Sequence, residues 1–258
     1  MNMFYSQKLC TFASINLKIG MKKLLSALLL PLLMVSCTSF FESEEDDVMS
    51  VKTIKSYEEK FSISMRSQAN TAANASYLTQ TEKEVFYYLN LARLNPRLFA
   101  QTFVTDYYHA PGYSAGYAFT ERKQSLIETL STMQPLEALI PNEMLFEFAE
   151  CFATGSGKLG IVGHDRSQTG CITPNQGWFA ECCDYGNYDS GLWVVLELLI
   201  DSGENNAALG HRKIMLDGSY LCMGVAARPH TGYGKVTVLD FWSEYNMNYY
   251  LRDTSEKK

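Results

Sequence analysis

The chain has 258 residues, of which 47% are hydrophobic and 19% are charged, as in an ordinary globular protein. This composition excludes a wholly disordered chain, a collagen-like chain and a multi-span membrane protein. The formal net charge is −6 with only four histidines, so we expect no nucleic-acid partner, because such partners are bound by a basic surface.

The N-terminal region has the pattern of a segment that is removed during export. A basic start, Met21-Lys22-Lys23, precedes an apolar run from Leu24 to Val35. This run is too short to span a bilayer comfortably and is typical of a secretory signal. We therefore predict a signal peptide over residues 1–36, with Met21 as the true start of translation.

The end of this run resembles the lipobox of bacterial lipoproteins. Val35-Ser36-Cys37 places a small residue before a cysteine that, in such proteins, is lipidated and becomes the new N-terminus. The resemblance implies a lipid anchor on Cys37, a membrane as partner, and a place in the bacterial cell envelope, either periplasmic or on the cell surface. A cleaved soluble form and a short membrane anchor are the alternatives.

Seven cysteines are present, and export allows disulfides to form between them. Cys10 lies in the segment expected to be removed, and Cys37 is the expected lipid site. The neighbours Cys182 and Cys183 are badly placed to bond to each other, because a peptide link between them strains the bridge. The prediction is a disulfide from Cys171 to Cys182 or Cys183.

Residues 37–78 are polar and biased in composition. An acidic cluster at Glu42–Asp47 is followed by a polar stretch at Ser67–Asn74, with little that could anchor a core. We expect a flexible acidic linker between the lipid and the folded domain.

Helical patterns begin near Thr79. Either Thr79-x-x-Glu82 or Thr81-x-x-Glu84 fits a capping box, and Asn95-Pro96 ends the helix that follows. A second helix is expected at 121–133. A third follows Pro141-Asn142 and stops at Gly155-Ser156-Gly157, and a fourth covers about 190–199.

The last third of the chain changes to the pattern of strands. Tyr220–Ala227 and Lys235–Trp242 are apolar or alternating runs on either side of a loop at 228–234, which predicts a hairpin. Helices first and a hairpin last indicate an α+β domain in which helices cover a small antiparallel sheet.

Reactive side chains gather in three short segments near glycines or helix ends. These segments are Gly163-His164-Asp165-Arg166, Ala180-Glu181-Cys182, and Asp201 followed by Gly210-His211-Arg212. Two imidazoles and two carboxylates of this kind could bind a divalent metal, or could exchange protons near neutral pH.

These segments, with their neighbours, resemble the CAP superfamily, which includes cysteine-rich secretory proteins, antigen 5 and plant pathogenesis-related proteins. The resemblance lies in Leu89-Asn90-x-x-Arg93-x-Asn95-Pro96, Gly163-His164, Ala180-Glu181, Gly210-His211-Arg212 and Val238–Phe241, in this order. It is strongest with the bacterial SCP-like branch and covers about Thr79 to Ser243. It implies a CAP/SCP-like domain over residues 79–250, built as an α-β-α sandwich with a central cleft.

The resemblance also implies a tetrad of two histidines and two acids in that cleft. Position by position, the tetrad is His164, Glu181, Asp201 and His211. Glu197, one helical turn before Asp201, competes for the place of the fourth acid. Several members of the family bind Zn²⁺ or another divalent metal through the two histidines, so His164 and His211 are the expected ligands of a weak site.

No single reaction is shared by the family, so the resemblance does not fix an activity. We expect an envelope-anchored protein that binds a divalent metal and a small or apolar ligand or an envelope partner. The alternative is a metal-assisted, protease-like hydrolase that uses the same tetrad. Two aromatic stretches, Phe86-Tyr87-Tyr88 and Tyr107-Tyr108, could line a groove, although aromatic residues at such positions are more often part of the core.

Overall fold

The structure, a computed structural model, describes residues 49–108, 118–171, 179–203 and 208–243, and all of them belong to one compact unit that begins at Ser43. Within these ranges the helices are α1 (Val51–Glu58), α2 (Ile63–Ala69), α3 (Gln80–Leu94), α4 (Pro96–Phe99), the π-helical turn η1 (Ala100–Val104), α5 (Phe119–Thr132), α6 (Glu143–Leu159), α7 (Gly191–Ile200) and α8 (Gly210–Met215). The strands are β1 (Ile140–Pro141), β2 (Ala180–Tyr185), β3 (Tyr220–His230) and β4 (Gly234–Ser243).

The strands form one sheet in the order β1-β3-β4-β2. The β3–β4 hairpin and the β2–β4 pair are antiparallel, as the α+β prediction required. The two-residue strand β1 pairs in parallel with β3, so the sheet is mixed where a purely antiparallel sheet was expected. The predicted α+β class is confirmed.

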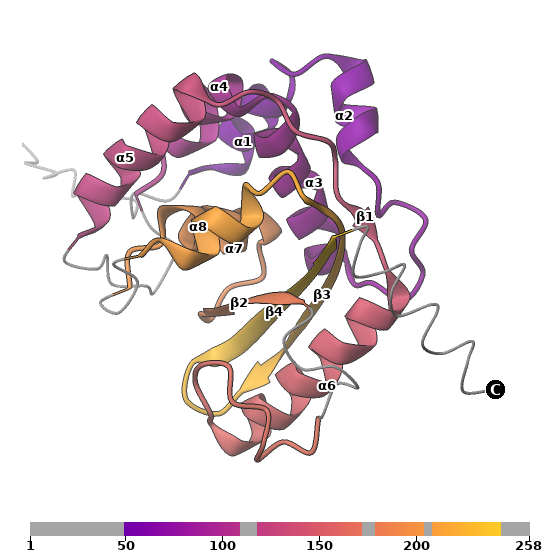
Figure 1. Ribbon diagram of the computed structural model, residues 1–258. Coiled ribbons are helices and arrows are strands. Elements are labelled where there is room, and N and C mark those ends of the chain that lie inside the picture. The colour runs from indigo at the N-terminus through magenta and orange to yellow at the C-terminus, as the bar shows by residue number, and fades with distance from the viewer. Residues whose placement is uncertain (1–48, 109–117, 172–178, 204–207, 244–258) are drawn as a thin grey trace, which may run out of the picture. The chain divides into compact units, whose positions relative to one another are not determined.

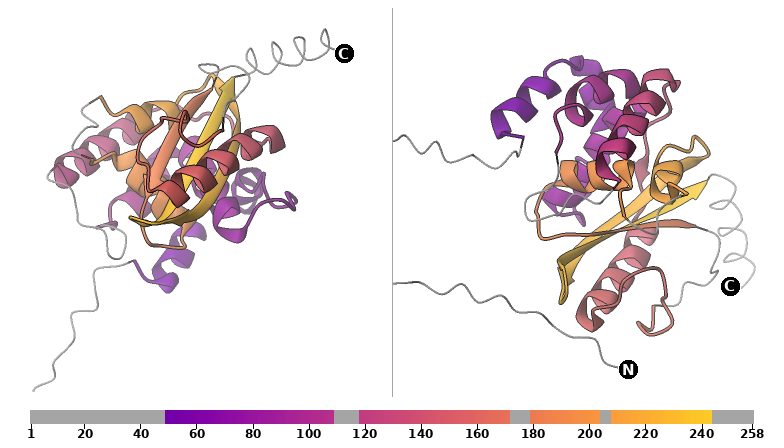
Figure 2. Two further views of the ribbon diagram at one scale, coloured as in Figure 1. Left: turned by 90° about the horizontal axis from the view of Figure 1, so that it is seen from below. Right: turned by 90° about the vertical axis from the view of Figure 1, so that its left-hand side faces the viewer.

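Helices cover both faces of this sheet (Figures 1 and 2). Helix α6 lies against one face, and α3, α7 and α8 lie against the other. The contact of α6 with β3 is close, because a Cβ atom added to Gly224 would lie 2.2 Å from the backbone carbon of Leu145. A glycine at this position lets the helix backbone rest directly on the strand.

Helix α6 is longer than the sequence pattern predicted. It continues through Gly155-Ser156-Gly157, which we expected to stop it, and ends at Gly160, whose left-handed φ of 69° forms the C-cap. A Cβ atom on Gly157 would lie 2.1 Å from the carbonyl oxygen of Pro229 on β3. Gly157 therefore permits the close approach of α6 to β3, and the prediction that Gly155-Ser156-Gly157 ends the helix is wrong.

The prediction of a flexible linker over residues 37–78 is wrong for the part that the structure describes. Helices α1 and α2 lie in this segment, and Met49, Phe61 and Leu78 are buried in the core. The ring of Phe61 stacks on that of Phe103 with the centroids 6.1 Å apart. A few widely spaced apolar side chains are enough to dock a segment whose average composition is polar.

Helix α3 begins and ends as the sequence indicated. Thr79 and Glu82 form the capping box, and Asn95 ends α3 and caps α4, where Pro96 occupies the first position. In its interior, the Asn90 amide donates to the carbonyls of Ala69 and Leu139, which ties α3 to the segments around it.

Arg93 in α3 is fully buried. Its guanidinium donates hydrogen bonds only to backbone carbonyls among its contacts here, those of Glu137, Met215, Asp217 and Tyr220, at 2.9–3.0 Å. These carbonyls belong to the chain before β1, to the end of α8 and the turn after it, and to the first residue of β3, so one side chain joins segments that are far apart in sequence. The Asn-x-x-Arg motif is thus structural.

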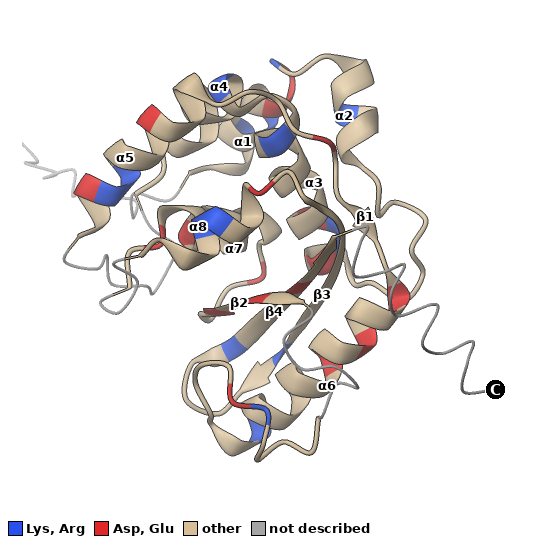
Figure 3. Cartoon of the chain, viewed as in Figure 1, with Lys and Arg blue, Asp and Glu red and all other residues tan. Residues whose placement is uncertain are grey.

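In Figure 3, positions of basic and acidic residues are interspersed along the helices. No helix among residues 49–108, 118–171, 179–203 and 208–243 is long and apolar enough to cross a membrane.

Replacing Arg93 with Met should lower the free energy of unfolding by about 3 kcal/mol or more, because buried carbonyls lose their donors. Arg97→Met is the matched control, since the Arg97 side chain is on the surface and, among the described residues, donates to Ser131 O alone, at 3.3–3.4 Å. We expect the control to change stability by less than about 0.5 kcal/mol. Urea unfolding of the three proteins measures both effects, and equal stability of Arg93→Met and wild type would contradict the assignment.

Candidate metal centre

His164 lies on the segment between α6 and β2, beside Glu181 of β2. Its Nδ1 is 2.8 Å from Glu181 Oε1. The imidazole is 56% exposed, whereas the carboxylate is only 8% exposed. The segment is fixed next to His164, because Gly163 N donates to the Tyr185 hydroxyl at 2.9 Å. His164 therefore reaches solvent from a rigid support.

His211 is held by Asp201 in a similar way. Asp201 ends α7 in a left-handed conformation with φ 59°, which aspartate tolerates better than most residues. Its Oδ1 lies 2.9 Å from His211 Nδ1, and its Oδ2 accepts a hydrogen bond from His211 N at 3.2 Å. The carboxylate of Asp201 thus orients the ring of His211 and also binds a backbone N–H in the first turn of α8.

Two arginines fix the end of α7 from which Asp201 projects. Arg212 donates to the carbonyls of Leu199 and Ile200 at 2.7 and 3.0 Å, and Arg122 of α5 donates to the carbonyl of Asp201. The last carbonyls of a helix have no partner within the helix, so these bonds satisfy them. Arg212 of the Gly-His-Arg segment therefore positions the acid that holds the preceding histidine.

The two histidine–carboxylate pairs meet beside β2, an edge strand of the sheet. The ring centroids of His164 and His211 are 6.4 Å apart, with an interplanar angle of 56°. Two imidazoles that share one tetrahedral zinc ion at about 2.1 Å from each nitrogen have centroids about 5.3 Å apart, so these two rings would have to move roughly 1 Å closer to share an ion. The structure thus brings together the four residues that the resemblance implied.

Cys183 adds a sulfur atom that the sequence analysis did not assign to this site. Its Sγ lies 3.7 Å from His164 Nδ1. His164, Glu181 and Cys183 form a group that could hold a metal ion, because one ligand atom from each lies within 4.8 Å of the others. Alternation along β2 places Glu181 and Cys183 on the same face, which is the signal that could have found Cys183.

The thiol of Cys183 is not in the deprotonated form that binds a metal ion. Burial raises its pKa well above the usual value, and the charges of Glu181 and Asp240 raise it further. The thiol is therefore protonated at neutral pH, and it would become a ligand only if an ion displaced its proton. The two imidazoles are the stronger candidates, since neutral imidazole ligates without this cost.

Glu181 lies in a buried charge cluster with Arg166 and Asp240. Burial raises the pKa of Glu181, but the hydrogen bond from His164 and the charge of Arg166 outweigh it, so the pKa stays below its usual range. Asp240 has the opposite shift, because its full burial and the negative charge of Glu181 raise its pKa well above the ordinary value. Of the two carboxyls that share Arg166, Glu181 is the one whose ionised form its surroundings favour.

Glu197, the competitor for the fourth acid, lies in a second buried cluster. It accepts a hydrogen bond from the Tyr107 hydroxyl at 2.6 Å, whereas Asp201 is the acid that bonds to His211. Next to Glu197, Asp184 accepts a hydrogen bond from Tyr188 at 2.6 Å. Burial raises the pKa of Asp184 to about 7, and the charge of Glu197 adds to the shift.

We expect the raised pKa of Asp184 to make the protein less stable as the pH rises. A carboxyl with a folded pKa of about 7 and an unfolded pKa near 3.9 stabilises the fold below pH ~4, and this contribution is lost up to pH ~7 by at most about 1.4 kcal/mol per unit. Asp184→Asn should flatten this fall in urea unfolding at pH 5–8. Asp165→Asn, on the surface, should keep the wild-type slope, and a slope unchanged in Asp184→Asn would contradict the assignment.

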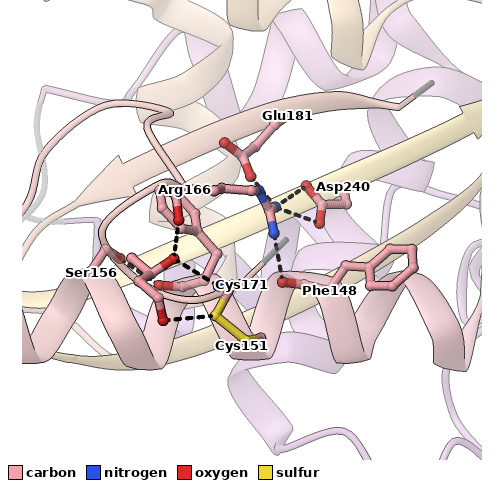
Figure 4. The surroundings of a disulfide bond; sticks show 9 residues. Phe148, Cys151, Ser156, Arg166, Cys171, Glu181 and Asp240 are labelled. Carbon is pink, nitrogen blue, oxygen red and sulfur yellow. Dashed lines mark hydrogen bonds and ion pairs between the residues drawn. A yellow bond between two sulfur atoms is a disulfide. The ribbon is translucent and has the colours of Figure 1, made fainter. Parts of the chain in front are cut away.

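The disulfide joins Cys151 to Cys171, which are 20 positions apart in the sequence. The predicted pairing of Cys171 with Cys182 or Cys183 is wrong. Cys182 is buried with its sulfur 3.9 Å from the carbonyl oxygen of His211, and Cys183 lies beside His164. Helix α6 brings Cys151 next to Cys171 instead, and the bridge ties the segment of His164 and Arg166 to α6 (Figure 4).

Removal of this bridge by Cys151→Ser and Cys171→Ser together should lower the free energy of unfolding by about 3 kcal/mol, as expected for a loop of this length. Peptide mapping checks the pairing itself. After alkylation without reductant, we expect a linked Cys151–Cys171 peptide, and we expect Cys182 and Cys183 to react only in denaturant. A linked peptide that contains Cys182 or Cys183 would contradict the structure.

A separate hollow of about 900 Å³ lies between α1, α2 and α3, helices that contribute none of the tetrad residues. Tyr87 and Tyr88 line it, together with Arg66 and Lys83, whereas Phe86 and Tyr107 are buried in the core. The aromatic stretches noted in the sequence thus divide between the core, this hollow and, for Tyr108, the exposed surface.

No protein-family model matches this sequence, and no curated protein matches it either.

Proposed function

We propose that this chain is an SCP-like member of the CAP superfamily whose cleft binds a divalent metal ion through His164 and His211. The single observation that supports this proposal best is the arrangement of the two rings, each bonded through Nδ1 to a buried carboxylate and 6.4 Å from the other. The order of the sequence motifs supports the family, and the geometry supports the metal.

The donor set fits Zn²⁺. Metal-binding histidines usually donate one ring N–H to a carboxylate and ligate through the other nitrogen, which is the arrangement of both pairs here. Imidazole ligands suit zinc, and a carboxylate behind each ring raises its basicity. When bound, zinc would supply an electrophilic centre with room for an oxygen or nitrogen donor from a ligand. Glu181 and Asp201 would orient the rings, and His164 would stay open to solvent.

The surroundings of the site disfavour a hydrolase that uses a cysteine nucleophile. Among the described residues, the thiols nearest to it are Cys182 and Cys183, and burial raises the pKa of both well above the usual value. Such thiols are poor nucleophiles, because the thiolate is the reactive form. We infer that the cleft presents the metal to a small or apolar ligand or to a protein partner.

The proposed place of action is the bacterial cell envelope. The Cys151–Cys171 disulfide fits an oxidising compartment outside the cytoplasm. The signal peptide at 1–36 and the lipid site Cys37 lie outside the described residues and stay predictions from the sequence.

Zinc titration by calorimetry tests the proposal. His164→Ala and His211→Ala should each abolish binding, and Glu181→Gln and Asp201→Asn should weaken it by about 10- to 100-fold, because they only orient the rings. Cys183→Ser shows whether the thiol contributes. Asp165→Asn, next to His164 but on the surface, is the matched control and should bind as wild type does.

Zinc binding that persists in both histidine variants would overturn the metal site. A protease activity on casein that disappears in His164→Ala and His211→Ala, while both variants stay folded, would favour the hydrolase over the binding role.

A further inference from the structure

Arg166, two residues after His164, is a buried cation that contacts both aromatic rings and hydrogen-bonding groups. Its side chain is only 4% exposed. Its guanidinium lies over the rings of Phe152 and Phe179, with centroid distances of 4.7 and 5.0 Å. Aromatic rings at these distances hold a guanidinium in one place and exclude water from it.

The polar contacts of Arg166 converge on the acid that holds His164. Nη1 donates to the carbonyl oxygen of Phe148 on α6 at 3.0 Å. Nη2 donates to Asp240 Oδ2 at 3.0 Å and to Glu181 Oε2. Figure 4 shows the guanidinium between the two carboxylates. The guanidinium therefore binds one oxygen of Glu181, while the other oxygen, Oε1, meets His164 Nδ1.

We propose that Arg166 is a positioning residue for His164. By holding Glu181 Oε2, it directs Oε1 at His164 Nδ1 and so fixes the ring tautomer that has its proton on Nδ1. The tautomer of a histidine is set by the hydrogen bond that one of its nitrogens makes, and the other nitrogen is then the one that can ligate. This inference rests on the proposed metal site only for its consequence, that Nε2 of His164 is the ligand atom.

Glu181 needs a second contact if it is to keep the conformation that bonds to His164. Two groups lie near His164 Nδ1, the carboxylate of Glu181 at 2.8 Å and the sulfur of Cys183 at 3.7 Å. A glutamate with one bound oxygen has fewer accessible rotamers than a glutamate with both oxygens free, so Arg166 selects the conformation that bonds to His164.

The other histidine provides an internal control in the same molecule. Asp201 holds His211 by its carboxylate, and the bonds of Arg122 and Arg212 at this end of α7 go to backbone carbonyls. A change at Arg166 should therefore alter His164 and leave His211 as it is.

The test is a set of long-range ¹H–¹⁵N spectra of the full-length protein labelled in its four histidines, recorded without metal at a pH where the rings are neutral. The variants are Asp240→Asn alone and Asp240→Asn combined with Arg166→Met. Asp240→Asn removes one of the two carboxyls that share Arg166, so that only Glu181 loses its cation when Arg166 is then replaced, and Met keeps an apolar contact with the two rings.

We expect His164 to have its proton on Nδ1 in the wild type and in Asp240→Asn, and to become a mixture of both tautomers in the double variant, with His211 unchanged. An unchanged His164 in the folded double variant would overturn the proposal. If the double variant does not fold, Arg166→Lys takes its place. A lysine cannot bond Glu181, Asp240 and the Phe148 carbonyl with one planar fork, so a mixture is expected there too, and full retention of the Nδ1 tautomer would overturn the proposal.

Zinc titration of the same proteins separates this inference from the proposed function. In the double variant we expect zinc affinity to fall by about 10-fold or more relative to Asp240→Asn. If the wild type binds no zinc but the tautomer shifts as described, the proposed function fails and the positioning role stands. If zinc binds and the tautomer does not shift, the positioning role fails alone.

Discussion

Each imidazole of the site is oriented by a carboxylate, and each of these two acidic residues is in turn held in place by an arginine. Glu181 bonds to Arg166, whereas Asp201 is fixed through its own backbone carbonyl by Arg122. The α6 side of the sheet supplies Arg166, and the helices on the other side supply Asp201 and His211. Because β2 is an edge strand, the two pairs can meet next to it. The site therefore depends on both helix layers being docked correctly on one short sheet.

Buried arginines are the means by which this docking is achieved. Arg93, Arg166 and Arg212 are each at most 4% exposed, and each joins segments that are distant in sequence. A guanidinium without partners would be costly in such a place, and its five donors make it suited to collecting carbonyls and carboxylates from several elements at once. Two of these three side chains lie within two residues of a histidine of the site, at positions 166 and 212. The same residues thus serve the fold and the orientation of the rings.

Much of this arrangement could be predicted from local sequence signals. The capping box at Thr79, the helix at α7 and the β3–β4 hairpin follow from patterns that act over a few residues. The resemblance also implied that Asp201 is the acid near His211. It left Glu197 as the competitor, because the two acids are one helical turn apart.

Other features could not be predicted because they depend on tertiary contact. The glycines of α6 indicate a helix stop in the sequence, yet Gly157 is required where the helix crosses β3. Helices α1 and α2 are held by a few apolar side chains in this region, such as Phe61. The polar average composition of the segment gives no indication of them. The partner of Cys171 is decided by the path of α6 and not by spacing. The role of Arg166 appears only when β2 and β4 bring Glu181 and Asp240 together as register partners.

The central claim is that the two histidines share one metal ion. Crystals grown with zinc and measured at wavelengths on both sides of the zinc absorption edge test it most directly. The account predicts one anomalous peak within about 2.1 Å of Nε2 of both His164 and His211. A peak bound by only one of these rings, or no peak at either ring in a folded and saturated crystal, would contradict it.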